Sequence, residues 1–190
     1  GALVHIWFTR RQSKRELKSL ILAFATELIL AFERCVKYYE QAKKGEISFS
    51  SLFDFTDPST LSRLATVTTE PEMVAAIMDL KSIYFQIRRQ VEEASGNAAY
   101  AARLAQAGVE QAKYMQAATK AQGTALAFFL GPYERMVQET TLILDAAKKI
   151  SPGKVVEDLE KRFGDAKRKK AELEDLEHRQ KKGEEKQNKF

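Results

Sequence analysis

The apolar side chains of this chain recur at alternating intervals of three and four residues, which is the period of an α-helix and not of a β-strand. Between residues 16 and 43, one such stripe consists of Leu17, Ile21, Phe24, Leu28, Ala31, Cys35, Tyr38 and Ala42. A second stripe beside it consists of Ala25, Ile29, Phe32, Val36 and Tyr39. Two adjacent stripes make a face too broad for a two-stranded seam, so we expect this helix to pack against two neighbours.

Glycine and proline are few and clustered, which predicts long helices joined at definite points. The first helix is expected to end at Lys43-Lys44-Gly45. A capping box from Thr69 to Glu72 starts a second amphipathic helix, which is expected to end in a tight turn at Ser95-Gly96-Asn97. An alanine-rich helix over 98–130 then places Tyr100 and Phe128 on its packing seam. Further breaks are expected at Gly131-Pro132 and Ser151-Pro152-Gly153.

These elements predict an all-α fold, an antiparallel helical bundle of four to five long helices with coiled-coil-like packing. We assign residues 16–150 to the bundle and 151–190 to a charged C-terminal helix. Beyond Gly164 the chain is dominated by Lys, Arg, Glu and Asp. That tail is expected to be either a helix held by ion pairs or an extension without fixed structure.

The first 15 residues are interpreted as the end of a membrane anchor followed by a basic cluster. Residues 2–8 are mostly apolar, and the four cations Arg10, Arg11, Lys14 and Arg15 follow them without an intervening acid. Seven residues cannot cross a bilayer, so we expect the span to begin upstream of Gly1. Trp7 would then lie at the lipid headgroups and the cations on the cytoplasmic side. Two alternatives are an apolar helix tip that packs on a soluble bundle and an amphipathic segment on a membrane surface.

The connection over 46–69 is rich in phenylalanine, with Phe49, Phe53 and Phe55 interleaved with polar residues. We favour a plug that covers one end of the bundle, because clustered exposed phenylalanine lowers solubility. A partner-binding site formed by the same three residues is the alternative.

Residues that carry catalytic or metal chemistry are scarce. Cys35 is the only cysteine and fits the apolar stripe as a small core residue, and the two histidines, His5 and His178, lie near opposite ends of the chain. No phosphate-binding loop, nucleophile elbow or dinucleotide fingerprint occurs. The sequence therefore assigns no catalytic, cofactor-binding or metal-binding residue, and no small-molecule substrate. We expect a protein that is not an enzyme.

The stretches RRQSKR, ELKSLILAFATELILAFERCVKYYEQ and EPEMVAAIMDLKSIYFQIRRQVEE, all within residues 3–95, resemble a class of uncharacterised bacterial proteins. In that class a single membrane span precedes a cytoplasmic helical domain. The resemblance implies association with the inner membrane and a domain in the cytoplasm, and it implies no activity. A soluble cytoplasmic protein is the alternative.

The leading hypothesis is a scaffold or interaction domain that binds a protein partner, or itself, through its helices. The competing hypothesis is a nucleic-acid-associated coiled coil, suggested by an isoelectric point near 9.2 and the basic run 167–170. Acidic residues follow that run and no aromatic residues alternate with it, so nucleic acid is disfavoured. A helical cofactor-binding enzyme ranks third.

Overall fold

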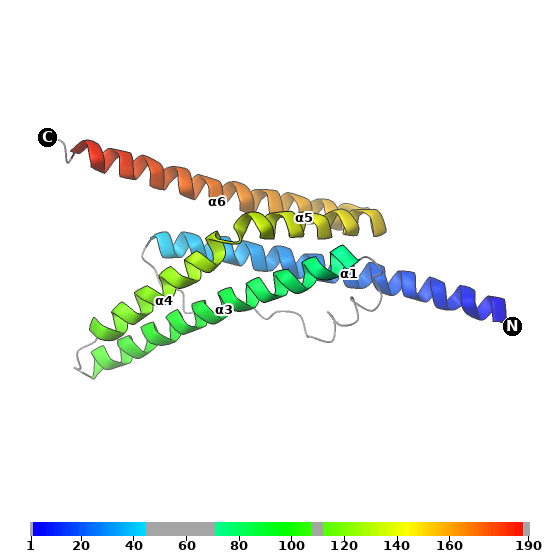
Figure 1. Cartoon of the computed structure of the whole chain (residues 1–190), viewed down its shortest axis with the longest axis horizontal. Helices are drawn as coiled ribbons and strands as arrows, with labels where there is room; N and C mark the ends of the chain where they lie inside the picture. Colours follow the sequence, from blue (N-terminus) through cyan, green and yellow to red (C-terminus); the bar gives the residue numbers. More distant parts are fainter. Residues whose placement is uncertain (1, 45–70, 108–111, 188–190) are drawn as a thin grey trace.

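The computed structural model describes residues 2–44, 71–107 and 112–187, and within these ranges every regular element is a helix. The five helices are α1 (Ala2–Lys43), α3 (Pro71–Gln106), α4 (Ala112–Leu130), α5 (Tyr133–Ile150) and α6 (Lys154–Gln187) (Figure 1). The expected all-α class is confirmed. The capping residue Thr69 and the phenylalanine-rich connection lie outside the described residues.

Helix α1 has 42 residues, which makes it about 60 Å long. It ends at Lys43, as predicted, and the Lys44 ammonium lies 3.0 Å from Glu40 in its last turns. Side chains of both predicted stripes are buried, including Phe24, Leu28 and Phe32. The helix contacts α4, α5 and α6, so it has three neighbours where two were predicted.

Helix α3 continues through Gly96, so the expected end of the helix at Ser95-Gly96-Asn97 is wrong. The prediction of a separate helix over 98–130 is wrong for the same reason, because the residues up to Gln106 belong to α3, and α4 spans Ala112–Leu130. One glycine costs a helix only about 1 kcal/mol relative to alanine. The buried residues Ala94, Ala98 and Ala101 extend the packed face past Gly96, and their contacts outweigh that cost.

Replacing Gly96 with alanine should therefore raise the free energy of unfolding by about 0.5–1 kcal/mol. A Cβ atom at this position would meet no atom within 4 Å, so the gain in helix propensity is not offset by a clash. Urea denaturation followed by circular dichroism measures the change. Gly153→Ala is the matched control and should destabilise, because Gly153 has a φ of 150°, which side chains rarely adopt. Loss of stability in Gly96→Ala would contradict a continuous α3.

The predicted break at Gly131-Pro132 is confirmed, since α4 ends at Leu130 and α5 starts at Tyr133. A Cβ atom on Gly131 would lie 3.1 Å from the carbonyl oxygen of Ala127, so the turn is too close for a larger residue without a shift. The Met136 amide donates a hydrogen bond of 2.8 Å to the Pro132 carbonyl oxygen and closes the first turn of α5. The predicted break before α6 is confirmed as well, at Ser151-Pro152-Gly153.

The directions of the helices follow from Figure 1 and from ion pairs between them. Helices α3 and α4 run in opposite directions, as do α5 and α6. Helices α1 and α6 run in the same direction, because Arg162 pairs with Glu33 across 129 residues and Lys169 pairs with Glu40 at the same offset. The antiparallel bundle with coiled-coil-like packing thus stays a prediction for the fold as a whole.

Four aromatic rings from four helices meet at the centre of the core. The ring centroid of Phe32 on α1 lies 6.2 Å from Phe129 on α4, 5.8 Å from Tyr133 on α5 and 4.9 Å from Phe163 on α6. The Phe129 and Tyr133 rings are themselves 5.6 Å apart and nearly perpendicular, the geometry that aromatic pairs prefer. This cluster ties α1 to the three C-terminal helices.

Residues 94–107 and 112–122 form a hairpin that we call the arm. It projects beyond the body of the protein, at the end of the long axis opposite to the N-terminus (Figure 1). Its seam is made of the buried residues Ala94, Ala98, Ala101, Ala118 and Ala121, which are separate from the main hydrophobic core. Alanine side chains bury little area, so the two helices of the arm approach closely but gain little from each contact.

Candidate functional site

The structure describes only part of the predicted site. Phe49, Phe53 and Phe55 lie outside the described residues. Trp7, Arg10 and Arg11 belong to α1, but their side chains are likewise outside the described part of the chain, whereas Lys14 and Arg15 are exposed. None of the described helices combines the length and the hydropathy that crossing a bilayer requires.

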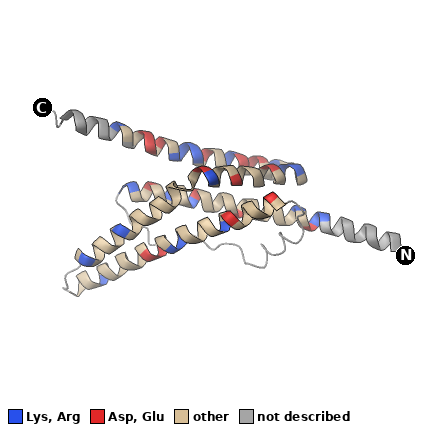
Figure 2. Ribbon diagram, viewed as in Figure 1, with Lys and Arg blue, Asp and Glu red and all other residues tan. Residues whose placement is uncertain are grey.

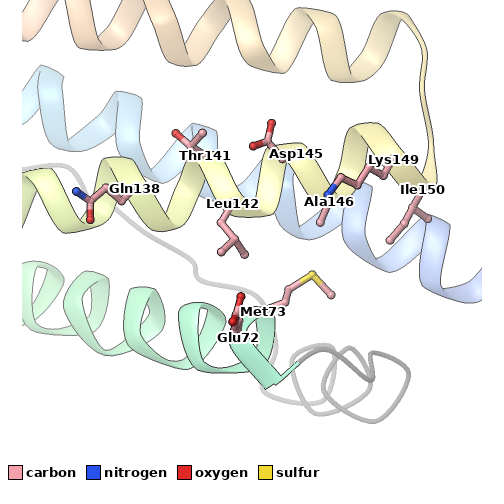
Figure 3. Close-up of a pocket in the computed structure, with 9 residues that line it drawn as sticks. All are labelled: Glu72, Met73, Gln138, Thr141, Leu142, Asp145, Ala146, Lys149 and Ile150. Atoms are coloured by element: carbon pink, nitrogen blue, oxygen red, sulfur yellow. The ribbon is translucent and has the colours of Figure 1, made fainter.

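A groove of about 390 Å³ lies between the first turns of α3 and the second half of α5. Leu142 extends from α5 toward Met73 and Glu72 on α3, and Ala146 and Ile150 complete the apolar wall (Figure 3). Charged side chains, Glu72, Asp145 and Lys149, and the polar Gln138 and Thr141 also line it. A groove that mixes apolar and polar side chains in this way suits an amphipathic segment.

Three charged side chains join α3 to α5 next to this groove. The Arg135 guanidinium of α5 contacts the Asp79 carboxylate of α3, and its Nε atom lies 3.7 Å from Oε1 of Glu139. Burial, together with a hydrogen bond to Asp79, raises the pKa of Glu139 to about 7. Burial also acts to raise the pKa of Asp79, but hydrogen bonds to Arg135 and Glu139 outweigh it and lower that pKa. Below about pH 7 the two carboxyl groups therefore hold one proton between them.

The basic run 167–170 is engaged within the molecule. The Lys167 ammonium lies 4.6 Å from the ring centroid of Phe163, Arg168 pairs with Asp165, and Lys169 is 2.6 Å from Glu40. Lys170 is buried, with its ammonium 3.9 Å from the Tyr133 ring centroid and 2.7 Å from Glu174. Each cation that suggested a phosphate-binding surface thus has a partner in the fold.

Ion pairs also hold α6 along α1. Arg162 donates two hydrogen bonds to the Glu33 carboxylate, of 2.8 and 2.5 Å. Glu40 accepts from both Lys169 and Lys44, and these two hydrogen bonds lower its pKa. Because the groups are partly exposed, each pair contributes modestly to stability, and their main effect is to fix the register of the two helices.

Several large apolar side chains are exposed, and sequence reasoning missed them. Met78 and Phe85 lie seven residues apart on the outer face of α3, and Phe85 is 65% exposed. On the arm, Tyr100 is 47% exposed and Met115 is exposed as well. The expectation that Tyr100 sits on the packing seam is wrong, because α3 continues past Gly96 and places Ala98 and Ala101 there instead. Met78 and Phe85 could have been found, since both fall off the apolar stripe of α3.

The arm is also basic. Its described residues carry Arg103, Lys113 and Lys120 and no Asp or Glu, and in Figure 2 the coloured ribbon of this hairpin shows blue without red. The Tyr100 and Tyr114 rings lie 4.7 Å apart in an edge-to-face pair, which links α3 to α4 near the tip. The arm thus combines exposed apolar groups with charge of one sign.

Cys35 is buried in the core of the described structure, as predicted, and burial raises the pKa of its thiol. The thiolate is the reactive form, so we expect Cys35 to resist a thiol reagent such as dithionitrobenzoate in the folded protein. The denatured chain should react with one equivalent per chain, since it has a single cysteine. Rapid reaction in native buffer would contradict the buried position.

Within the described residues, no three His, Cys, Asp or Glu side chains are placed to hold a metal ion.

No known family model matches the chain, and neither a curated protein nor a solved structure shows significant similarity to it.

Proposed function

We propose that this chain is a non-enzymatic helical interaction domain, an antiparallel bundle with coiled-coil-like packing that is tethered to the cytoplasmic face of a bacterial membrane. The observation that carries the proposal is the arm, which projects from the body and exposes Tyr100 and Met115 beside three cations. A hairpin that shares little of the core contributes little to the stability of the body, so its length is better explained by contact with a partner.

The position of the arm is consistent with a tether at the N-terminus. The N-terminal end of α1 and the tip of the arm lie at opposite ends of the long axis (Figure 1). Lys14 and Arg15 are exposed at the N-terminal end, where they could contact anionic lipid headgroups. A membrane at that end would leave the arm pointing away from the lipid, toward proteins of the cytoplasm.

The pairing of the basic run 167–170 favours a protein partner over nucleic acid. Phosphate binding by these residues would have to break contacts with Phe163, Asp165, Glu40 and Glu174. Nucleic-acid binding predicts retardation of DNA or RNA that weakens steeply with salt. Such retardation by the full chain at low salt would support the alternative, a nucleic-acid-associated coiled coil.

Photo-cross-linking in cells tests the interaction proposal. A photoreactive amino acid at Met115 should give discrete cross-linked products, because this side chain is exposed on the arm. The same amino acid at Val155, which is exposed at the start of α6, is the matched control and should give none of these products. Identical products from both positions, or none from Met115, would remove the support for the arm as a binding surface.

Membrane fractionation tests the tether independently. The full-length gene product should sediment with the inner membrane and resist extraction by high salt, since a span holds it by hydrophobic contact. Release by salt alone would indicate electrostatic attachment, and a wholly soluble product with no span encoded upstream would end the tether proposal.

A further inference from the structure

The C-terminal part of α6 extends past the helix on which it packs. Lys169 pairs with Glu40, and α1 ends three residues after Glu40, at Lys43. Because the two helices run in parallel, the part of α6 that follows Leu173, which still packs against the core, projects beyond the end of α1 (Figure 1). We call this segment the overhang. A polar helix of this length is marginal in water when nothing packs against it.

An acidic surface lies where the overhang begins. Glu172 and Asp175 are exposed, Glu174 lies between them, and Leu176 is 55% exposed beside them. In Figure 2 this stretch of α6 follows the blue run 167–170 as a red one. The exposed cation Arg179 follows one turn later, so the acids form a single turn beside Leu176, and a basic helix could cover that turn.

The arm has the complementary chemistry. Lys113 and Lys120 are seven residues apart, so they lie on the same face of α4 about 10 Å from each other. Gln116 and Ala117 line the surface between them, and Met115 is exposed nearby. The small side chain of Ala117 allows a second helix to approach closely there, and Arg103 on α3 adds a third cation.

We propose that the overhang of one copy of this chain docks on the arm of a second copy, so that two chains form a symmetric dimer with two such contacts. In Figure 1 the arm and the overhang diverge on either side of the end of α1, which places the acids of α6 away from the lysines of the same chain. A twofold axis repeats the contact and closes the assembly. Two arms would repel each other, since the described charge on each is positive.

This inference depends on the proposed function, because it names the partner of the interaction domain as a second copy of the chain. Sedimentation velocity of the full chain at increasing concentration should show a reversible monomer–dimer equilibrium. Higher salt should weaken the dimer, since the paired charges are exposed. A chain that is monomeric at every concentration overturns the inference.

Charge reversal provides the decisive comparison. The double variant Lys113→Glu/Lys120→Glu should weaken dimerisation by at least about tenfold, and Glu172→Lys/Asp175→Lys should do the same. Combining all four changes in one chain should restore the dimer, because opposite charges then face each other again. The matched control, Lys154→Glu/Lys161→Glu, reverses two exposed lysines at the start of α6 and should leave the equilibrium unchanged. All six positions are exposed, and circular dichroism checks that each variant folds.

The outcomes separate this inference from the proposed function. Monomeric protein whose Met115 cross-links to a different protein would overturn self-association but support the interaction domain. A dimer that none of the charge reversals affects would overturn the arm–overhang contact. Binding of the arm to phosphatidylglycerol vesicles, lost in Lys113→Glu/Lys120→Glu, with no dimer at any concentration, would replace the second copy with a lipid surface.

Discussion

Replacing Phe32 with alanine should lower the free energy of unfolding by about 3–5 kcal/mol. The side chain is 0% exposed, and its ring contacts rings of α4, α5 and α6 at centroid distances of 6.2, 5.8 and 4.9 Å. The substitution would leave a cavity between four helices that cannot all move inward together. Urea denaturation followed by circular dichroism at 222 nm, the usual helix band, measures the loss.

Phe85→Ala is the matched control, because it removes the same atoms from a side chain that is 65% exposed. Its cost should stay within about 0.5 kcal/mol, as for most surface substitutions. If Phe85→Ala were as destabilising as Phe32→Ala, the outer face of α3 would have to be covered in solution. If Phe32→Ala cost little, the aromatic cluster would not be the centre of the core.

The sequence predicted the helices best where large apolar residues alternate with charged ones. In α1, Phe24, Leu28 and Phe32 could face only inward, because Lys18, Arg34 and Lys37 occupy the other side. The ends of helices at Gly131-Pro132 and Ser151-Pro152-Gly153 were predicted as well, since proline removes a backbone donor and Gly153 adopts a positive φ.

The prediction of the end of the helix and of its packing seam failed between residues 94 and 107 because this stretch is rich in alanine. An alanine in a helix has little effect on the free energy of folding whether it is buried or exposed. The spacing of the alanines therefore does not reveal which of them form the seam. Tyr100 was assigned to the seam because it continued the spacing, yet the neighbouring Ala98 and Ala101 are buried instead. Gly96 was taken as an end of the helix because the packing that carries α3 past it involves α4, which the local sequence does not show.

The candidate site could not be predicted, because its residues are distant in the sequence. Asp79 meets Arg135 across 56 residues, and Glu33 meets Arg162 across 129. In its local sequence, each of these four residues looks like an ordinary charged residue on the surface of a helix. The arm was missed for another reason, since its cations, Arg103, Lys113 and Lys120, are spread over two helices that only the hairpin brings together.

Stability should fall as the pH rises from about 4.5 to about 7, and the change of Glu139 to glutamine should remove most of this fall. Glu139 has an ordinary pKa of 4.5 in the unfolded chain, whereas burial and Asp79 raise its pKa to about 7 in the folded protein. Between these values the folded state holds a proton that the unfolded state has lost, so raising the pH favours unfolding. Above about pH 7 the carboxyl group is ionised in both states, and the effect levels off.

Between these two pH values the free energy of unfolding should fall by on the order of 2 kcal/mol. This is somewhat below the full value for a pKa shift of this size, because the Glu139 side chain is 20% exposed. Asp79 acts in the opposite direction at lower pH: its pKa is lowered in the folded state, so its contribution is lost on acidification below its ordinary value of 3.8. The two effects occupy separate ranges of pH. The charged groups that act on Glu139 are Asp79 of α3 and Arg135 of its own helix.

Glu139→Gln keeps a hydrogen-bond donor toward Asp79 but carries no titrating proton. The variant should match the parent in urea denaturation near about pH 5 and exceed it near about pH 8, where the parent holds two carboxylates against one guanidinium. Glu134→Gln removes an exposed carboxylate from the same helix and is the control, and its stability should follow the pH profile of the parent. Parallel profiles for Glu139→Gln and the parent would mean that the two carboxyl groups share no proton, and that Arg135 alone neutralises both.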